Sequence, residues 1–291
     1  MMKFSIITIT YNAAEALPRT VDSVFAQTWP CVEHIIVDGA STDATLDVAR
    51  DYERRSREAG SGHNVIITSE PDNGLYDAMN KGLDMATGDY VLFLNAGDFL
   101  PDVEVLAVVA AKADEGQMSY GKRPAVVYGD TDIVDSEGRY LYPRRLRPPR
   151  RLNWRSFMHG MLVCHQAFYA RTDIARAIHY DLRYRYSADV DWCIRVMKSA
   201  ERQGLPMTNT GTTVACYTEE GQTTLHHRAS LKERYRVMAY HYGALPTLLM
   251  HCWFVLRNVF VKPDEQCQTC LGIAMARKRR MKSNFIRKIR F

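Results

Sequence analysis

Short runs of apolar, β-branched residues recur along the first half of the chain. The runs of strand length are 4–10, 34–37, 65–68, 90–94 and 125–128. Segments with helical spacing separate the first four runs. This alternation predicts an α/β fold, a mainly parallel sheet flanked by helices on both faces. Ligands of such sheets bind at the carboxyl ends of the strands, so polar residues just after each strand deserve the closest reading.

The segments between these runs also predict where helices begin. A first helix is expected over 13–27, with Pro18 in its early part. A second is expected after Ser41, which suits an N-cap position. A third should start near Gly74 and carry apolar residues on one side, namely Leu75, Ala78, Met79, Leu83 and Ala86. Two further helical stretches are expected within 231–262.

The charge of the chain is concentrated in its last residues. Lysine and arginine number 38 against 33 aspartates and glutamates, and eight of the basic side chains lie within 271–291. Without them the balance is 30 against 33, so the body is mildly acidic. We therefore expect no nucleic acid partner and an anionic membrane surface as the partner of the tail, the alternative being a solvated tail.

Cellular location is suggested by the cysteines and the two ends of the chain. The seven cysteines are scattered through apolar runs, as in a reducing compartment, and the first residues lack the pattern of a signal peptide. Segment 245–261 is rich in Leu, Val, Phe and Trp but is interrupted by His251, Arg257 and Asn258. It falls short of a membrane span. We expect a cytoplasmic protein that is peripheral on the cytoplasmic face of the inner membrane.

Polar side chains follow three of the predicted strands. Tyr11 follows the first strand, Asp38 the second, and Asp98 the fourth. A tyrosine face can stack on a base, one aspartate can accept hydrogen bonds from a nucleoside, and another can hold a divalent metal against a diphosphate. The set suggests a nucleoside diphosphate ligand. For residues 38–43, the alternative is a turn that only caps the following helix.

Several motifs resemble those of family 2 glycosyltransferases, bacterial exopolysaccharide and colanic-acid type. They are 9–12 (ITYN), 37–45 (VDGASTDAT), 72–82 (DNGLYDAMNKG), 86–90 (ATGDY) and 95–98 (NAGD). The resemblance covers about the first 230 residues as an ordered series. It implies a GT-A Rossmann-like fold, a nucleoside-diphosphate sugar donor, a divalent metal (Mg or Mn) and inversion at the anomeric carbon. It also implies a catalytic domain over 1–230, while helical spacing and charge predict a helical extension over 231–270 and a membrane-surface tail over 271–291.

The same resemblance assigns roles to individual residues. It implies that Asp98 binds the metal. The positions expected to bind the donor nucleotide and diphosphate are Thr10, Tyr11, Asp38, Asp77, Asn80, Lys81 and Asn95. The chain departs from the family pattern at Asn95 and Gly39, where many members have an acid. The first departure weakens the case for strict metal dependence, and the second weakens any inference about the base.

The proton acceptor of an inverting transfer must be one carboxylate. By resemblance it is Asp189, although Ala188 replaces the family's preceding glutamate. Asp191 is the alternative acid, with pairing to Arg195 four residues on as its structural interpretation. His165 is expected to contact metal, diphosphate or acceptor, or else to be a core histidine.

Other groups leave alternatives open. Within 221–228 lies a loop of the kind that closes over the donor, where His226 or His227 could complete a metal site. His251 and Cys252 with Cys267 and Cys270 have the residue types of a zinc site, but the pair at 251 and 252 lacks the usual spacing.

These observations together predict an inverting glycosyltransferase of surface polysaccharide biosynthesis that uses a lipid-linked saccharide acceptor. The alternatives are transfer directly to a polyprenyl phosphate and a catalytically inactive sugar-nucleotide-binding protein.

Overall fold

The computed structural model describes residues 1–218 and 227–260 of the chain. Residues up to Ala244 form one compact unit, and a second unit begins at Leu245. His226, the side chain of His227, Cys267, Cys270 and the basic tail lie outside the described part.

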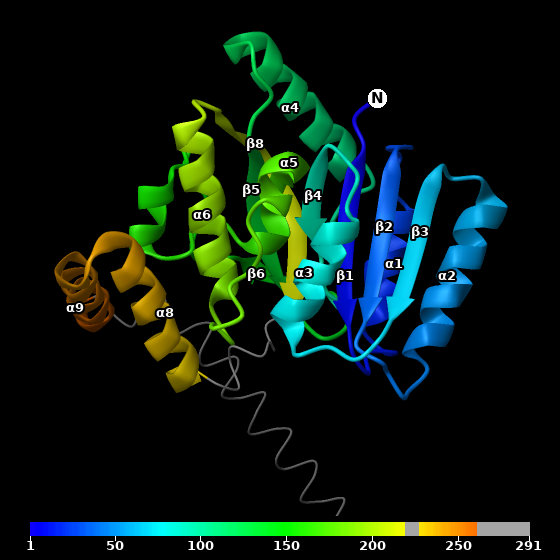
Figure 1. The fold of residues 1–291 in the computed structure, drawn as a ribbon, viewed down its shortest axis with the longest axis horizontal. Coiled ribbons are helices and arrows are strands. Elements are labelled where there is room, and N and C mark those ends of the chain that lie inside the picture. Colours follow the sequence, from blue (N-terminus) through cyan, green and yellow to red (C-terminus); the bar gives the residue numbers. More distant parts are fainter. Residues whose placement is uncertain (219–226, 261–291) are drawn as a thin grey trace, which may run out of the picture. The chain divides into compact units, whose positions relative to one another are not determined.

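The centre of the first unit is a mixed β-sheet (Figure 1). Its strands are β1 (Phe4–Thr10), β2 (Val32–Asp38), β3 (His63–Ser69), β4 (Tyr90–Phe93), β5 (Val126–Val134), β6 (Tyr140–Pro143), β7 (Phe168–Arg171) and β8 (Met207–Thr218). Their order is β3-β2-β1-β4-β7-β5-β6, and β8 pairs with β5. The strands β1 to β4 are mutually parallel, and β8 is parallel to β5. Strands β6 and β7 pair antiparallel with their neighbours. The mainly parallel sheet predicted from the sequence is thus confirmed.

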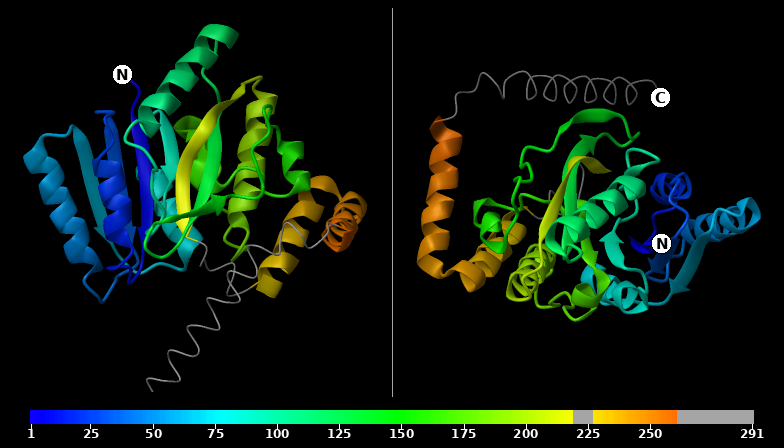
Figure 2. Two further views of the ribbon diagram at one scale, coloured as in Figure 1. Left: turned by 180° about the vertical axis from the view of Figure 1, so that it is seen from behind. Right: turned by 90° about the horizontal axis from the view of Figure 1, so that it is seen from above.

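Helices cover both faces of this sheet (Figure 2). The helices of the described residues are α1 (Leu17–Phe25), α2 (Thr45–Ala59), α3 (Leu75–Met85), α4 (Val105–Tyr120), α5 (Thr172–Arg176), α6 (Ala188–Arg202), α8 (His227–Tyr242) and α9 (Ala244–Phe260), with short 3-10 turns η1 (Trp154–His159) and η2 (His165–Ala167). Helix α3 packs on β1 and β2, whereas α1 and α2 pack on the opposite face. The first helix pair buries Ile36 of β2 against Leu17, Val21 and Tyr52.

Local chemistry explains where the helices start, and two of the predicted starts need correction. Helix α1 begins at Leu17 rather than near residue 13, because Pro18 fits only the first turn, where its missing N–H is not needed. Helix α2 begins at Thr45, and the expectation that Ser41 is its N-cap is wrong. The hydroxyl of Ser41 is instead bonded to Asp38. Helix α3 starts after Gly74, as expected, although Leu75 is 40% exposed.

An aromatic stack joins helix α3 to helix α6. Tyr180 lies between Tyr76 of α3 and Trp192 of α6, with ring centroids 5.4 and 5.0 Å away. Phe93 at the end of β4 contacts both Tyr180 and Trp192 edge-on. Such pairs contribute about 0.5–1.5 kcal/mol each beyond their buried area. The stack therefore fixes the two helices against the same strand end, where polar side chains gather.

Candidate active site

The carboxyl ends of β1 and β2 form one wall of the site. Thr10 and Asp38 are register partners at these ends. Thr10 is buried, and its hydroxyl has no hydrogen-bond partner among the described residues. Tyr11, the next residue, is 64% exposed and offers an open ring face. The predicted nucleotide positions are therefore brought together, with a ring available for stacking.

Asp38 shapes this wall from within. Its carboxylate is fully buried and accepts hydrogen bonds from the Ser41 N–H at 2.9 Å, the Ser69 hydroxyl at 2.7 Å and the Ser41 hydroxyl. An ionised carboxylate has about four acceptor positions, so most of them serve the turn. In this structure the Asp38 carboxylate builds the turn, and its role in binding the donor nucleotide stays a prediction.

The acid missing at Gly39 is replaced in space by another residue. A Cβ added to Gly39 would lie 2.5 Å from the Oδ2 atom of Asp72 and 3.3 Å from the Tyr11 ring. The absence of a side chain at position 39 is what lets the Asp72 carboxylate lie beside Tyr11. Asp72 also accepts the N–H of Gly74 at 2.8 Å, which holds it at the start of α3. Sequence reasoning missed Asp72, because its proximity to Gly39 arises only on folding.

The expected diphosphate positions on α3 have partners within the protein. Asn80 exchanges hydrogen bonds with both backbone groups of Tyr180, at 2.7 and 3.0 Å. Lys81 pairs with Glu70 at 2.8 Å, and Asp77 accepts the backbone N–H of Asn73 at 2.9 Å. In this state the three side chains order the start of α3. Lys81 and Asp77 lie at its exposed side, whereas Asn80 ties α3 to the aromatic stack.

Asp98 is a buried carboxylate after β4. It is 8% exposed, and burial raises its pKa to about 6, against the opposing effects of a hydrogen bond from Gln166 and the charge of His165. The amide of Gln166 donates to Asp98 Oδ2 at 2.9 Å, and the Cys164 thiol donates to the same amide's oxygen at 2.6 Å. The thiol thereby sets which end of the amide faces Asp98.

Asn95 and Asp98 fit an oxygen-binding cation that arrives with a phosphate ligand. Asn95 Oδ1 is buried and finds no hydrogen-bond partner in the described part of the chain. No cluster of three or more His, Cys, Asp and Glu side chains suited to a metal occurs in residues 1–218 and 227–260. Magnesium is commonly held by one or two carboxylates together with substrate phosphates and water. The pair would therefore hold a metal jointly with a diphosphate rather than alone.

Asp189 reaches the same edge from the first turn of α6. Its Oδ1 atom accepts the Tyr76 hydroxyl at 3.2 Å, and its Oδ2 atom lies 3.6 Å from His165 Nδ1. Asn95 lies 3.4 Å from the other nitrogen of His165, which links both sides of the site. Burial alone would raise the pKa of Asp189, but His165 and Arg234 outweigh it and hold the pKa below its usual value. Asp189 is thus ionised at neutral pH, with 18% of its side chain exposed.

Asp191 points away from this edge. It is 2% exposed and lies between Arg195, at 2.6 Å, and His241 of α8, at 2.7 Å. The spacing of four residues predicted this pairing of Asp191 with Arg195, and the structure contains it. The two acids, two residues apart on the helix, therefore face different partners, as the helical geometry requires.

One short turn connects the two halves of the site. His165 and Gln166 are consecutive residues of η2, and they contact Asp189 and Asp98 respectively. Sequence analysis singled out His165 but gave no role to Gln166 or Tyr76. Tyr76 lies inside the 72–82 motif and Gln166 directly follows His165, so a signal existed for both.

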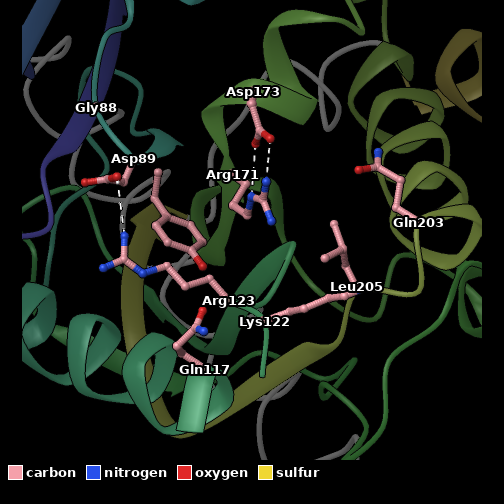
Figure 3. A pocket seen from close by; sticks show the side chains of 10 residues that line it. Gly88, Asp89, Gln117, Lys122, Arg123, Arg171, Asp173, Gln203 and Leu205 are labelled. Carbon is pink, nitrogen blue, oxygen red and sulfur yellow. Dashed lines mark hydrogen bonds and ion pairs between the residues drawn. The ribbon is translucent and has the colours of Figure 1, made fainter. Parts of the chain in front are cut away.

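A separate pocket lies at the opposite edge of the sheet (Figure 3). Its volume is about 610 Å³, and Gly88 to Tyr90, at the amino end of β4, form part of its lining. Two of its cations, Arg123 and Arg171, pair with Asp89 and Asp173. None of the residues described above lines it, so this pocket is not the candidate active site.

The segment 144–155 is rich in arginine, whose guanidinium groups suit phosphate oxygens. Arg144 donates instead to the backbone oxygens of Leu146 and Met161 at 2.9 and 2.7 Å. Arg155 pairs with Glu201 at 3.3 Å. These two arginines hold the extended segment against the domain.

Comparison with known proteins identifies the family of this chain. The model of the glycosyl transferase family 2 matches residues 5–177. A PGL/p-HBAD biosynthesis glycosyltransferase of Mycobacterium tuberculosis is 39% identical over 193 residues, which is 66% of this chain and 68% of the relative. The amylovoran biosynthesis glycosyltransferase AmsB of Erwinia amylovora is 30% identical over 203 residues, covering 68% of this chain and 64% of AmsB.

Solved structures share the fold. Residues 1–349 of Staphylococcus aureus TarS, in complex with UDP-GlcNAc, match with a TM-score of 0.67 and 22% identity, over 91% of this chain and 78% of that one. Full-length TarS is covered over 39% of its length. The mannosyltransferase PcManGT of Pyrobaculum calidifontis, in complex with GDP-Man and Mn²⁺, matches with a TM-score of 0.57 and 16% identity, over 94% and 80%.

The burial of Asp98 predicts a gain in stability when its charge is removed. The pKa in the folded state, about 6, exceeds the ordinary value of 3.8, so stability falls as pH rises from 3.8 to 6 and stays lower above. At pH 7.5 in EDTA, we expect Asp98→Asn to raise the free energy of unfolding by up to about 3 kcal/mol, since one pKa unit corresponds to about 1.4 kcal/mol. Urea denaturation measures this.

The same variant at pH 3.5 is the control, because protonated Asp98 carries no charge there. Manganese and a nucleoside diphosphate together should raise the melting temperature of the wild type at pH 7.5 but not that of Asp98→Asn. An Asp98→Asn protein less stable than the wild type at pH 7.5 would contradict the burial argument.

Proposed function

The chain belongs to glycosyltransferase family 2 and is a glycosyltransferase, and from this premise we propose that it is an inverting enzyme of surface polysaccharide biosynthesis. It takes a sugar from a nucleoside-diphosphate donor and transfers it to a lipid-linked saccharide. The observation that carries the proposal is the placement of Asp98 and Asp189 on the two sides of η2. An inverting transfer needs positive charge at the leaving diphosphate, which a metal held by Asp98 would supply, and a carboxylate at the attacking hydroxyl.

The donor would lie along the carboxyl edge of the sheet. Tyr11 offers a ring face for the base, and the Asp38 and Asp72 carboxylates offer acceptors for its N–H groups and the ribose. The diphosphate would then extend towards Asn95 and Asp98. A divalent metal held there with the diphosphate would supply positive charge for the leaving group.

Asp189 would act as the general base. Its carboxylate is ionised, partly exposed and oriented by the Tyr76 hydroxyl. It would accept the proton of the acceptor hydroxyl as that oxygen attacks the anomeric carbon opposite the diphosphate. His165, at 3.6 Å, would stabilise the carboxylate before the reaction.

Two named relatives support the pathway. One takes part in PGL/p-HBAD biosynthesis and the other in amylovoran biosynthesis. A product attached to a lipid carrier fits a protein that works at a membrane surface.

Helix α9 has the surface expected of a peripheral membrane protein. No described helix is both long and apolar enough to cross a bilayer. Yet Leu245, Leu248, Leu249 and Trp253 are 49–66% exposed, and their spacing puts them on one side of α9. The eight basic residues of 271–291 complement anionic lipid. We assign this side of α9 to an anionic membrane at the cytoplasmic face of the inner membrane.

The two aspartates of α6 give a matched test of the base. We expect Asp189→Asn to lower the rate of transfer by roughly a hundredfold to ten-thousandfold with donor affinity unchanged, because the amide keeps the shape but cannot take the proton. Asp191→Asn should lower the melting temperature and leave most of the rate per folded molecule. Transfer to an extracted lipid-linked acceptor, with a panel of nucleotide sugars, measures both. A fully active Asp189→Asn enzyme would refute the assignment.

Gly39 gives a test of the base subsite. In Gly39→Ala, the new Cβ would displace the Asp72 carboxylate and crowd Tyr11. We expect the Kd of the nucleoside diphosphate to rise about tenfold, which corresponds to the roughly 1.4 kcal/mol of one good contact. Calorimetric titration measures the Kd, and Gly121→Ala, which strains a left-handed backbone position remote from the site, controls for an effect of lowered stability on binding. Equal affinity of Gly39→Ala and wild type would remove Asp72 from the subsite.

Vesicle binding tests the membrane assignment. We expect Leu249→Glu with Trp253→Glu to abolish most binding to vesicles that contain anionic phospholipid, because both charges would enter the apolar region. Deletion of 271–291 should remove the salt-sensitive part of binding and leave donor hydrolysis intact. Met118→Glu, 79% exposed on α4, is the control. Unchanged binding of the α9 variant would show that α9 does not face the membrane.

A further inference from the structure

Helix α8 supplies a carboxylate to the start of the helix that carries Asp189. Glu233 of α8 accepts the backbone N–H of Arg185 at 2.9 Å, of Tyr186 at 2.6 Å and of Ser187 at 2.7 Å. These residues directly precede α6, and Asp189 is the second residue of that helix. Hydrogen bonds to an ionised acceptor are about twice as strong as neutral ones.

The start of α6 lacks a cap from its own sequence. Ser187 occupies the N-cap position and is fully buried, but its side chain makes no capping hydrogen bond. A buried N–H without a partner costs about 1–3 kcal/mol. Glu233, 46 residues beyond Ser187, satisfies the N–H groups that lead into the helix. The backbone before Asp189 is therefore held by α8 rather than by a local motif.

Helix α8 holds α6 again after Asp189. His241 contacts Asp191 at 2.7 Å, and each of these side chains is 2% exposed. Lys198 lies 3.0 Å from the other nitrogen of His241. Contacts from one helix thus bracket Asp189, at 185–187 before it and at Asp191 after it.

We propose that Glu233 is a positioning residue for the transfer reaction, which holds the start of α6 so that the Asp189 carboxylate meets the acceptor hydroxyl. The proposal rests on the proposed function of Asp189 as base. The Glu233 carboxylate accepts the backbone N–H groups of residues 185–187, so it acts on Asp189 through the backbone.

The charge of Glu233 has a second consequence. The start of a helix carries positive potential, which favours the ionised form of a nearby carboxylate. Glu233 opposes that potential, and so does Asp191 on α6 itself. The other titratable groups around Asp189 are Tyr76 of α3, Tyr180 of the aromatic stack, His165 and Cys164 at η2, Cys193 of α6 and Arg234 of α8. Removing the negative charge of Glu233 should therefore make Asp189 easier to ionise.

Two variants separate position from charge. Glu233→Ala removes both the hydrogen-bond acceptor and the negative charge. We expect kcat to fall about tenfold to a hundredfold with the Kd of the donor unchanged, because small displacements of a reacting group have effects of that size. Glu233→Gln keeps an acceptor for the N–H groups. It should lose less rate, and the acid limb of its kcat profile should move to lower pH.

The control is a carboxylate with similar bonds elsewhere. Asp135 accepts the backbone N–H groups of Glu137 and Arg139, both at 2.9 Å, in the turn between β5 and β6. Asp135→Ala should leave kcat and the acid limb as in the wild type. Folded fractions of all variants are measured by circular dichroism, and rates are expressed per folded molecule.

The outcomes distinguish this proposal from the proposed function. If Asp189→Asn is fully active, the assignment of the base fails, whatever Glu233 does. If Asp189→Asn is inactive while Glu233→Ala and Glu233→Gln both retain wild-type kcat and acid limb, Asp189 is the base and Glu233 does not position it. If Glu233→Ala does not fold, the acid limb of Glu233→Gln decides, and an unshifted limb overturns the proposal.

Discussion

Burial of ionised carboxylates at one edge of the sheet is the constraint on which the site depends. Asp98 lies after a strand whose residues are fully enclosed, and its burial raises its pKa to about 6. Asp189 is mostly buried as well, yet His165 and Arg234 hold its pKa below the usual value. The two acids thus have opposite environments, although consecutive residues of η2 contact them. The charge of Asp98 is buried with little compensation, which a cation would supply, whereas His165 and Arg234 already stabilise the charge of Asp189.

The rest of the fold serves to hold these carboxylates in place. The stack of Tyr76, Tyr180 and Trp192 fixes α3 against α6, and the Cys164 thiol fixes the amide that bonds Asp98. Helix α8 lies beyond the 5–177 span of the family match, and its Glu233 accepts hydrogen bonds from the backbone at the start of α6. A side chain that is held from several elements loses little entropy when the substrate arrives, which is the physical meaning of a preorganised site.

Departures from the family pattern are informative when viewed in space. At position 39 the missing side chain makes room for the Asp72 carboxylate, so an acid still borders the open face of Tyr11. At position 95 an amide oxygen remains unpartnered among the described residues, ready for a ligand without adding charge. At both positions the usual acid is missing, but an oxygen atom from another residue or from an amide is still present.

The sequence by itself determined the α/β class, the order of the first strands and the edge at which polar residues gather, because apolar periodicity and strand ends are local properties. It also determined where α3 begins, since Gly74 marks that start chemically. It could not determine that Ser41 bonds Asp38 instead of capping α2, nor that Asp72 occupies the space beside Gly39. Nor could it separate the surroundings of Asp189 from those of Asp191, or connect Glu233 to α6. Those contacts join residues distant in sequence, and only packing of the helices on the sheet brings them within hydrogen-bond distance.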